Sequence, residues 1–256
     1  MLTGIHTGGY GEDIEGYSLA KLLWDLDKVE GLQRIRISSI EASQITDEVI
    51  EVLQASDKMC RHLHIPLQAG DDDVLARMRR KYTMAEFTQK IEKIHAIMPD
   101  VAITTDVIVG FPGETEEMFR NGYRFMEQMQ FAEMHVFPYS KRTGTPAARM
   151  TDQVDEEVKN TRVHELIDLS EKMQLTYAEK FVGQVLEVIP ERSKEGLLPS
   201  GFIMGHADNY LQIVFEGSED LAGELCQVQV TSATANGCQG KLIRVLEHVQ
   251  AKAVNA

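Results

Sequence analysis

Segments that alternate polar and apolar residues carry the side chains best suited to bind ligands or move protons. The clearest is RHLHIPLQAG at residues 61–70, where strand alternation puts His62, His64 and Gln68 on one face and aliphatic residues on the other. Burying imidazole and amide groups is costly unless something on that face uses them. We therefore predict that this segment forms one wall of a polar cavity.

Three further segments repeat the alternation. Their polar members are Arg34, Arg36 and Ser38 in the first, Thr104 and Asp106 in the second, and Glu133, His135 and Tyr139 in the third. If the four strands are neighbours in one sheet, their polar faces line a common cavity.

Asp106 opens the sharpest local motif, DVIVGFPGET at residues 106–115. Glycine and proline at a strand end, followed by acids at a helix start, also describe an ordinary strand-to-helix turn. The aspartate within an otherwise apolar strand favours a functional role, because a buried carboxylate needs a partner. The loop TGGYG at residues 7–11 could bring backbone amides close to a ligand or be a flexible turn, and it matches neither the Walker A nor the dinucleotide-binding pattern.

Strand-like runs that begin near residues 1, 32, 61, 101 and 132 must position these side chains, and helical periodicity fills the intervals between them. This order predicts a parallel sheet with right-handed crossovers. Strands with one polar face favour a curved sheet with helices on the outside only, and five visible strands are too few to close an eight-stranded barrel. The predicted fold class is therefore α/β, with a partial (β/α) barrel.

From residue 152 to about residue 181 the apolar spacing indicates a long helix, and short strands separated by Gly, Asn, Asp and Ser follow it. The expected strands are residues 183–189, 201–204, 210–215, 224–231 and 237–246. Such a series is typical of a small all-β barrel of the oligonucleotide-binding type. The predicted domains are residues 1–150, a helical connection at 151–180 and a β domain at 181–250.

Composition narrows the class of protein. The chain is 43% hydrophobic, without an apolar run long enough to span a bilayer, and its first residues lack the basic region of a signal peptide. Cys60, Cys226 and Cys238 lie far apart, which indicates a reducing cytoplasm and argues against a disulfide framework or a cysteine-held metal site. We predict no metal ligands. The net charge of −14 discourages a general attraction to phosphate.

Basic residues gather in two clusters, RMRRKY at residues 77–82 and Lys141 and Arg142 with Arg149. A solvated helix face explains such clusters in most proteins. Because both clusters follow predicted strands, they would lie at the same rim of a barrel, where they could face phosphate groups.

Five motifs, taken in order, resemble the radical-SAM methylthiotransferases. They are LTGIHTG from residue 2, HIPLQAG from residue 64, RMRRKYT from residue 77, TDVIVGFPGET from residue 105 and FPYSKRTGT from residue 137. The resemblance covers essentially the whole chain, because the β domain is similar to the TRAM domain of that family. HTGGYG at residues 6–11 and SSIE at residues 38–41 resemble the branch that thiomethylates N6-threonylcarbamoyladenosine at position 37 of tRNA.

The resemblance implies a radical-SAM partial barrel, here without its first strand, in which a [4Fe-4S] cluster cleaves S-adenosylmethionine to a 5′-deoxyadenosyl radical. That radical would abstract a hydrogen from C2 of the adenine, and a second cluster would deliver the sulfur. The residues implied for the S-adenosylmethionine pocket are Gly8, Gly9, Ser38, Glu41, His64, Gln68, Asp106 and Tyr139. Those implied for tRNA contacts are Arg79, Arg80, Lys141 and Arg142.

One departure from the family changes the expected activity. The Cys-x-x-x-Cys-x-x-Cys loop that ligates the radical-SAM cluster is absent, and the cysteines present have the wrong spacing to replace it. We therefore expect a truncated part of the enzyme that is inactive alone. In the TRAM-like region, residues 181–249, nine acids outnumber four Lys and Arg, so RNA binding there would need a local patch or aromatic stacking.

Two alternatives stay open: a non-catalytic module for tRNA binding or assembly, and a methylthiotransferase that acts on dimethylallyl-adenosine in tRNA. An unrelated barrel enzyme is disfavoured, because no nucleophile–base set stands out. The expected partner is tRNA, with no membrane, and an exposed sheet edge would invite self-association.

Overall fold

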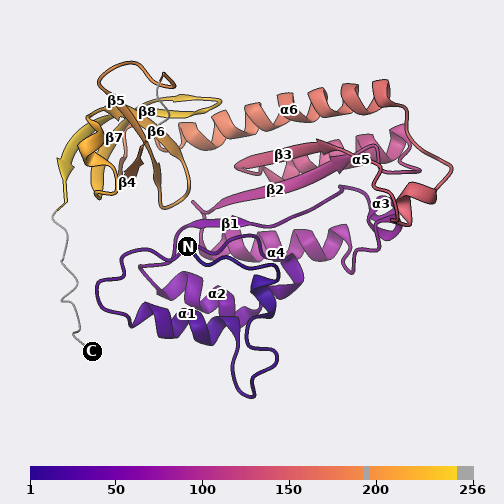
Figure 1. The fold of residues 1–256 in the computed structure, drawn as a ribbon, viewed down its shortest axis with the longest axis horizontal. Coiled ribbons are helices and arrows are strands. Elements are labelled where there is room, and N and C mark those ends of the chain that lie inside the picture. Colours follow the sequence, from indigo (N-terminus) through magenta and orange to yellow (C-terminus); the bar gives the residue numbers. More distant parts are fainter. Residues whose placement is uncertain (193–195, 247–256) are drawn as a thin grey trace. The chain divides into compact units, whose positions relative to one another are not determined.

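The computed structural model describes residues 1–192 and 196–246. The chain forms two compact units, each assembled from segments that are distant in the sequence (Figure 1). The first unit contains residues 1–38, 47–62 and the chain from residue 174 onward. The second contains residues 39–46 and 63–173.

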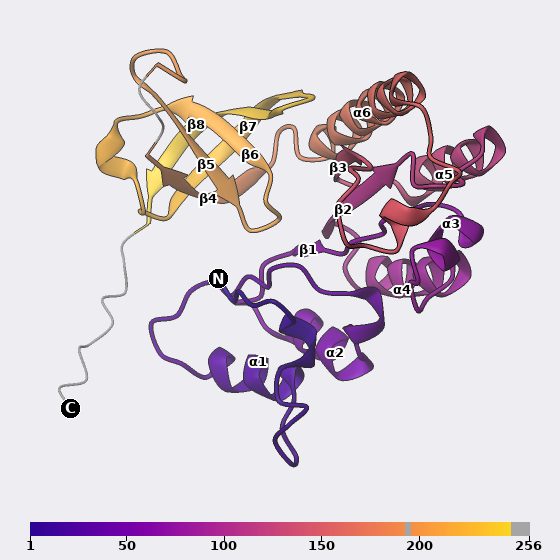
Figure 2. The same ribbon diagram turned by 45° about the vertical axis from the view of Figure 1, so that its right-hand side comes forward.

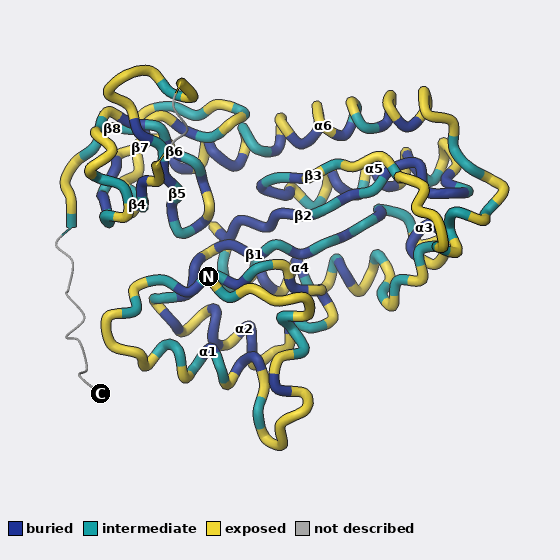
Figure 3. The backbone as a smooth tube through the Cα atoms, in the orientation of Figure 1, coloured by how far each residue is buried: buried dark blue, intermediate teal, exposed yellow. Residues whose placement is uncertain are grey.

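A three-stranded sheet with the order β1-β2-β3 is the centre of the second unit. Its strands are β1 (His62–His64), β2 (Ala102–Val109) and β3 (Glu133–Pro138). β2 lies in the middle and is buried along most of its length (Figure 3). Its parallel register with β3 pairs Thr104 with Glu133 and Asp106 with His135.

Side chains that cap the helices determine where each helix of the second unit begins. Asp71 caps α3 (Asp72–Arg77), and Thr83 forms a reciprocal capping box with Glu86 at the start of α4 (Met84–Ile97). Thr115 caps α5 (Glu116–Met129) by accepting the N–H of Met118. Each cap satisfies a backbone N–H that the first turn leaves without a partner. The helix α6 (Glu156–Glu179) follows a short 3-10 turn at Ala147–Arg149.

The strands expected near residues 1 and 32 are reduced to isolated bridges. Leu2 pairs with Ile37, and Ile35 with Met59, both in the expected parallel direction. A longer ladder does not form from Leu2, since the chain bends after Gly4 and enters a 3-10 turn at Thr7–Gly9. In the first unit, the helices α1 (Leu19–Asp27) and α2 (Asp47–Ala55) lie side by side (Figures 1 and 2). A further 3-10 turn at Ala42–Gln44 belongs to the second unit.

Five strands of the first unit close into a small barrel (Figure 2). They are β4 (Val185–Glu191), β5 (Phe202–Ala207), β6 (Gln212–Glu216), β7 (Cys226–Thr234) and β8 (Gly237–Val245), in the order β4-β5-β6-β8-β7, with a 3-10 turn at Glu219–Leu221 before β7. The interior is apolar, with Ile213, Phe215 and Val228 fully buried. The predicted fold class, an α/β partial barrel followed by a small all-β barrel, is confirmed. The domain boundaries at residues 150 and 180 stay predictions.

Arginines of the N-terminal segments contact the β-barrel within the first unit. Arg34 donates a hydrogen bond to the carbonyl of Glu187 (2.8 Å), and Arg36 donates to the carbonyl of Ala207 (3.3 Å). The Arg36 guanidinium also lies 4.5 Å from the ring centroid of Tyr210. The prediction that Arg34 and Arg36 line a common cavity is therefore wrong, because their side chains are long enough to reach the carbonyls of the barrel.

Tyr210 is the centre of an aromatic stack in this contact. The rings of His62 and His206 stack on it, with centroids at 4.8 Å and 4.6 Å. The expectation that His62 shares a cavity with His64 is also wrong, because the His62 ring packs on Tyr210 of the barrel. Its Nδ1 is 3.0 Å from Arg36 Nη1.

No helix within residues 1–192 and 196–246 is long and apolar enough to cross a membrane. In the sheet that the structure describes, β3 is paired only with β2, and on its other edge the buried hydroxyl of Ser170 in α6 accepts the N–H of Met134 (2.9 Å). Self-association through a sheet edge stays a prediction.

Replacing Tyr210 with leucine tests the stack. Leucine keeps much of the apolar volume but removes the ring face that Arg36, His62 and His206 contact. We expect a loss of about 1–2 kcal/mol in the free energy of unfolding, the size of a cation–π contact together with an aromatic pair. Urea denaturation measures it. The control is Tyr10→Leu, because the Tyr10 ring is equally exposed but has only an edge contact with Tyr17. Equal urea midpoints of unfolding for the two variants would contradict a stabilising role of the Tyr210 stack.

Candidate functional site

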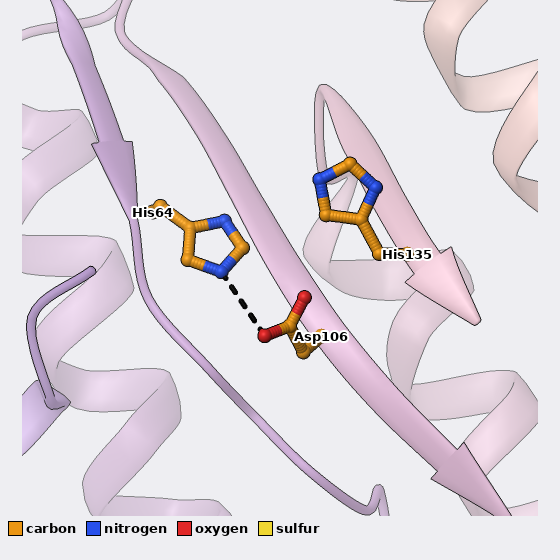
Figure 4. A group of neighbouring side chains, drawn as sticks. All are labelled: His64, Asp106 and His135. Atoms are coloured by element: carbon orange, nitrogen blue, oxygen red, sulfur yellow. Dashed lines mark ion pairs between the residues drawn. The ribbon is translucent and has the colours of Figure 1, made fainter. Parts of the chain in front are cut away.

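Two imidazoles and a carboxylate converge on one face of the sheet in the second unit. His64 ends β1, Asp106 lies in β2, and His135 lies in β3 opposite Asp106. His64 Nε2 is 3.3 Å from Asp106 Oδ2, and the two imidazole centroids are 5.7 Å apart (Figure 4). The three residues come from neighbouring strands, so the hydrogen-bonded sheet sets their spacing.

Strand alternation explains why these side chains meet. Thr104 lies two residues before Asp106 and therefore on the same face, where its Oγ1 is 2.9 Å from His64 Nδ1. Thr105 points to the other face and is fully buried, and its Oγ1 accepts the N–H of Leu67 (2.9 Å). Adjacent threonines thus have different tasks: one orients an imidazole and the other holds the segment after β1 against β2.

The Asp106 carboxylate contacts imidazole, and no arginine or lysine, in the described residues. The hydrogen bond from His64 lowers the pKa of Asp106, and partial burial opposes this shift. No lysine or arginine in residues 1–192 and 196–246 forms an ion pair with this carboxylate. With side-chain exposures of 18% for His64, 30% for Asp106 and 44% for His135, the group stays open to a polar or cationic ligand.

The other residues predicted for the cofactor pocket have varied surroundings. Gln68 adopts a left-handed conformation (φ 68°) and lies against β2, where its N–H donates to the carbonyl of Asp106 (2.8 Å). Tyr139 follows β3, and its buried Oη has no hydrogen-bond partner among the described residues. Oε1 of Glu41 lies 3.9 Å from Nη1 of Arg80, one of the residues predicted to contact tRNA.

Gly8, Gly9 and Ser38 belong to the first unit. The two glycines form the 3-10 turn with Thr7, whose Oγ1 is 3.2 Å from Ser38 Oγ. A Cβ on Gly9 would meet the His6 ring at 2.2 Å, so close packing within this loop already accounts for that glycine. The structure thus brings Ser38 near the glycine loop, and separately brings His64, Gln68 and Asp106 together.

The residues predicted to contact tRNA are largely exposed. Arg79 ends the turn after α3 with φ 59°, and Lys141 and Arg142 follow β3. Arg80 is half-buried, and its Nε has no hydrogen-bond partner among the described residues. Their roles as site residues stay predictions.

His135 and Thr104 are functional candidates that sequence reasoning did not select. Both were visible as polar members of alternating segments. Choosing them required the register that sets Asp106 opposite His135, and alternation alone does not reveal register.

The turn after β2 is held by a buried ion pair. Glu114 accepts a hydrogen bond from the N–H of Gly110, and its Oε2 is 2.8 Å from Arg162 Nη1 of α6. Both side chains are about 5% exposed, and burial raises the pKa of Glu114 while Arg162 opposes the rise. Lys159, one turn earlier in α6, donates to the carbonyl of Tyr139 (3.3 Å). Through Glu114 and Arg162, the turn GFPGE is held against α6. Through Lys159, the end of β3 is held against the same helix. We call these contacts the clamp.

Cys60, Cys226 and Cys238 are free and buried. Burial raises the pKa of each thiol, that of Cys238 to about 11. Neutral thiols are poor metal ligands, and in the described residues the cysteines do not converge on a common point.

Replacing Arg162 with leucine would leave Glu114 buried and unpaired. We expect a loss of about 3–5 kcal/mol in the free energy of unfolding at neutral pH. The matched control is Arg120→Leu, whose ion pairs with Glu116 and Glu165 are exposed and should contribute less than about 1 kcal/mol.

The pH dependence of this variant has a definite sign. Without Arg162 the folded-state pKa of Glu114 rises further above its ordinary value of 4.5. The penalty is then present at neutral pH and shrinks as pH falls toward 4.5, because Glu114 becomes neutral in both states. Urea denaturation at several pH values measures the difference, and a penalty that does not change with pH would contradict a buried, charged Glu114.

Comparison with known proteins finds a matching family model and several relatives that are similar over nearly the whole chain. Residues 3–126 match the radical SAM superfamily. The chain is 56% identical over 96% of its length to the threonylcarbamoyladenosine tRNA methylthiotransferase MtaB of Bacillus subtilis, covering 55% of that protein. It is 40% identical over 96% of its length to the tRNA-2-methylthio-N(6)-dimethylallyladenosine synthase of Thermoanaerobacter sp. strain X514, covering 52% of it.

A third relative is the MtaB protein of Thermotoga maritima, 37% identical over 93% of this chain and 53% of that protein. The chain thus spans about half the length of the curated relatives it matches. Among solved structures, the radical SAM enzyme coproporphyrinogen III oxidase of Escherichia coli is similar with a TM-score of 0.49 and 16% identity, over 82% of this chain and 50% of that one. By its radical SAM match and its identity to the Bacillus subtilis relative, the chain belongs to the radical SAM methylthiotransferases.

Proposed function

We propose that the chain is part of an enzyme that adds a methylthio group to C2 of N6-threonylcarbamoyladenosine-37 in tRNA. The observation that carries the proposal is the 56% identity, over 96% of the chain, to a relative named for the threonylcarbamoyladenosine substrate. Two relatives named for the dimethylallyladenosine product, from Thermoanaerobacter and Carboxydothermus, are 40% identical. The cytoplasm is the proposed location, since the substrate is tRNA.

An iron–sulfur cluster is implied by the family, but the cysteines of this chain do not fit one. Cys60, Cys226 and Cys238 are buried thiols that do not converge, whereas such clusters are held by several thiolates. The contribution we assign to this chain is therefore to bind and orient the substrates.

S-adenosylmethionine is the second implied group, and the polar residues of the second unit suit it. The buried Tyr139 Oη lacks a partner within residues 1–192 and 196–246, and a hydroxyl or amine of the nucleoside would provide one. The Asp106 carboxylate, held by His64, can accept hydrogen bonds from ribose hydroxyls or from the amino group. S-adenosylmethionine supplies radical chemistry when it is bound with its cluster. We propose His64, Gln68, Asp106 and Tyr139 as its contacts, and keep Gly8, Gly9, Ser38 and Glu41 as candidates.

The direct test of the proposed function is nucleoside analysis of tRNA by mass spectrometry, in cells with and without the gene. We expect deletion to remove 2-methylthio-N6-threonylcarbamoyladenosine. Loss of the methylthio-dimethylallyl nucleoside instead would favour the other branch. Loss of neither would favour a non-catalytic tRNA module and overturn the proposal.

The role of Asp106 is tested with the allele Asp106→Asn in the same cells. Asparagine keeps the shape of the side chain but removes its charge, so S-adenosylmethionine would be misplaced and the modification rate should fall by roughly 10²-fold. The control is Asp152→Asn, which changes an exposed carboxylate paired with Arg77. Equal modification in the two alleles would remove Asp106 from the proposed pocket.

Contact between the exposed arginines and tRNA is tested by salt-dependent binding. Arg79→Ala should weaken tRNA binding and reduce the slope of log K against log salt by about 0.9, the value for one lost phosphate contact on a duplex. Arg124→Ala is the control, because this arginine on α5 is bonded to Asn121 of its own helix. A slope that is unchanged in the Arg79 variant would exclude the contact.

A further inference from the structure

The group His64, Asp106 and His135 has the composition and spacing of a metal site. One ligand atom from each residue lies within 4.8 Å of the other two, and no other such group of three occurs in residues 1–192 and 196–246. Figure 4 shows the two rings and the carboxylate on adjacent strands, around a common space. We propose that these three side chains bind a divalent transition-metal ion.

The charge of the group calls for a cation. The Asp106 carboxylate is partly buried, and among the described residues it contacts imidazole but forms no ion pair with an arginine or lysine. A divalent ion supplies two charges and is shared by all three side chains.

A neighbour of His64 orients its ring as a metal site requires. Thr104 Oγ1 lies 2.9 Å from His64 Nδ1, which leaves Nε2 on the side of Asp106. Glu133 Oε1 lies 3.8 Å from His135 Nδ1, beyond hydrogen-bond distance, so the Nδ1 side of this ring faces a carboxylate without being bonded to it. Histidines that bind metals usually donate the other ring N–H to an oxygen, and this contact fixes the tautomer and the ring orientation.

The donor set indicates the class of ion. Two imidazole nitrogens and one carboxylate oxygen suit zinc, iron(II) or cobalt(II), whereas magnesium and calcium prefer oxygen ligands alone. Three protein ligands on a partly exposed face leave coordination positions for water or for an oxygen or nitrogen of a further ligand. The site is thus of the open kind that polarises a bound molecule, rather than the closed kind that supports a fold.

The site shares His64 and Asp106 with the proposed S-adenosylmethionine pocket, and the open coordination positions of the ion would face that ligand. The two proposals are tested separately, because neither S-adenosylmethionine nor tRNA is present in the metal titration. The metal-free chain is titrated with Co²⁺, and the visible d–d absorption of the bound ion is recorded. We expect saturation at one ion per chain, displacement by Zn²⁺ and a higher melting temperature in the presence of either ion. His135→Ala and Asp106→Asn should abolish the signal, and Thr104→Val should weaken binding by about 10- to 100-fold.

The control variant is His164→Ala, which removes an exposed histidine of α6 that contacts the carbonyl of Asn160 and should bind cobalt as the parent does. His135 is half exposed, so its replacement keeps the test valid even if Asp106→Asn unfolds, and near-UV circular dichroism verifies the fold. Absence of saturable cobalt binding would overturn the proposal. Binding that survives His135→Ala, or that disappears when the thiols are blocked, would overturn it as well.

Discussion

The parallel register between β2 and β3 is the constraint on which the candidate site depends. It sets Asp106 opposite His135 and Thr104 opposite Glu133, so four polar side chains share one face of the sheet. A shift of β3 by one residue relative to β2 would turn Glu133 and His135 to the apolar face. Thr105 opposes such a slip from the other side of β2, because its buried hydroxyl accepts the N–H of Leu67 in the segment after β1.

The ends of the same strands are held by charge rather than by apolar packing alone. Arg162 joins Glu114 of the turn after β2 to α6, and Lys159 of α6 binds the carbonyl of Tyr139 after β3. A buried ion pair gains little net stability over an apolar pair, but breaking it is costly. The clamp therefore serves mainly to fix where Tyr139 and the end of β2 lie, and Tyr139 keeps a buried hydroxyl without a partner in the described residues.

Local patterns were sufficient to predict much of this arrangement. Period-two alternation found the segments of β1, β2 and β3, and turn residues found all five strands of the small barrel. Family motifs indicated a radical SAM enzyme, in agreement with the match over residues 3–126. Helix caps such as Thr83 and Thr115 lie next to the helices they begin, so they too are local signals.

What alternation could not supply was the partner of each polar residue. Arg34, Arg36 and His62 have the right parity for the cavity, yet they contact the β-barrel, because a long or aromatic side chain can meet a segment more than a hundred residues away. Two acids of the β domain also lie near arginines of the earlier segments, since Arg34 lies 3.7 Å from Glu187 and Arg61 lies 4.0 Å from Asp208. His135 was overlooked for the opposite reason: its importance follows from the register with Asp106, and a single strand does not show it.

The central claim is that the polar face of β1, β2 and β3 binds ligands. Its most direct measurement is NMR of the chain with isotope-labelled histidine side chains, during addition of S-adenosylmethionine and, separately, of Zn²⁺. We expect the ring signals of His64 and His135 to shift with at least one of these ligands, while those of His164 and His206 stay in place. Shifts confined to the latter pair, or no shifts with either ligand, would contradict it.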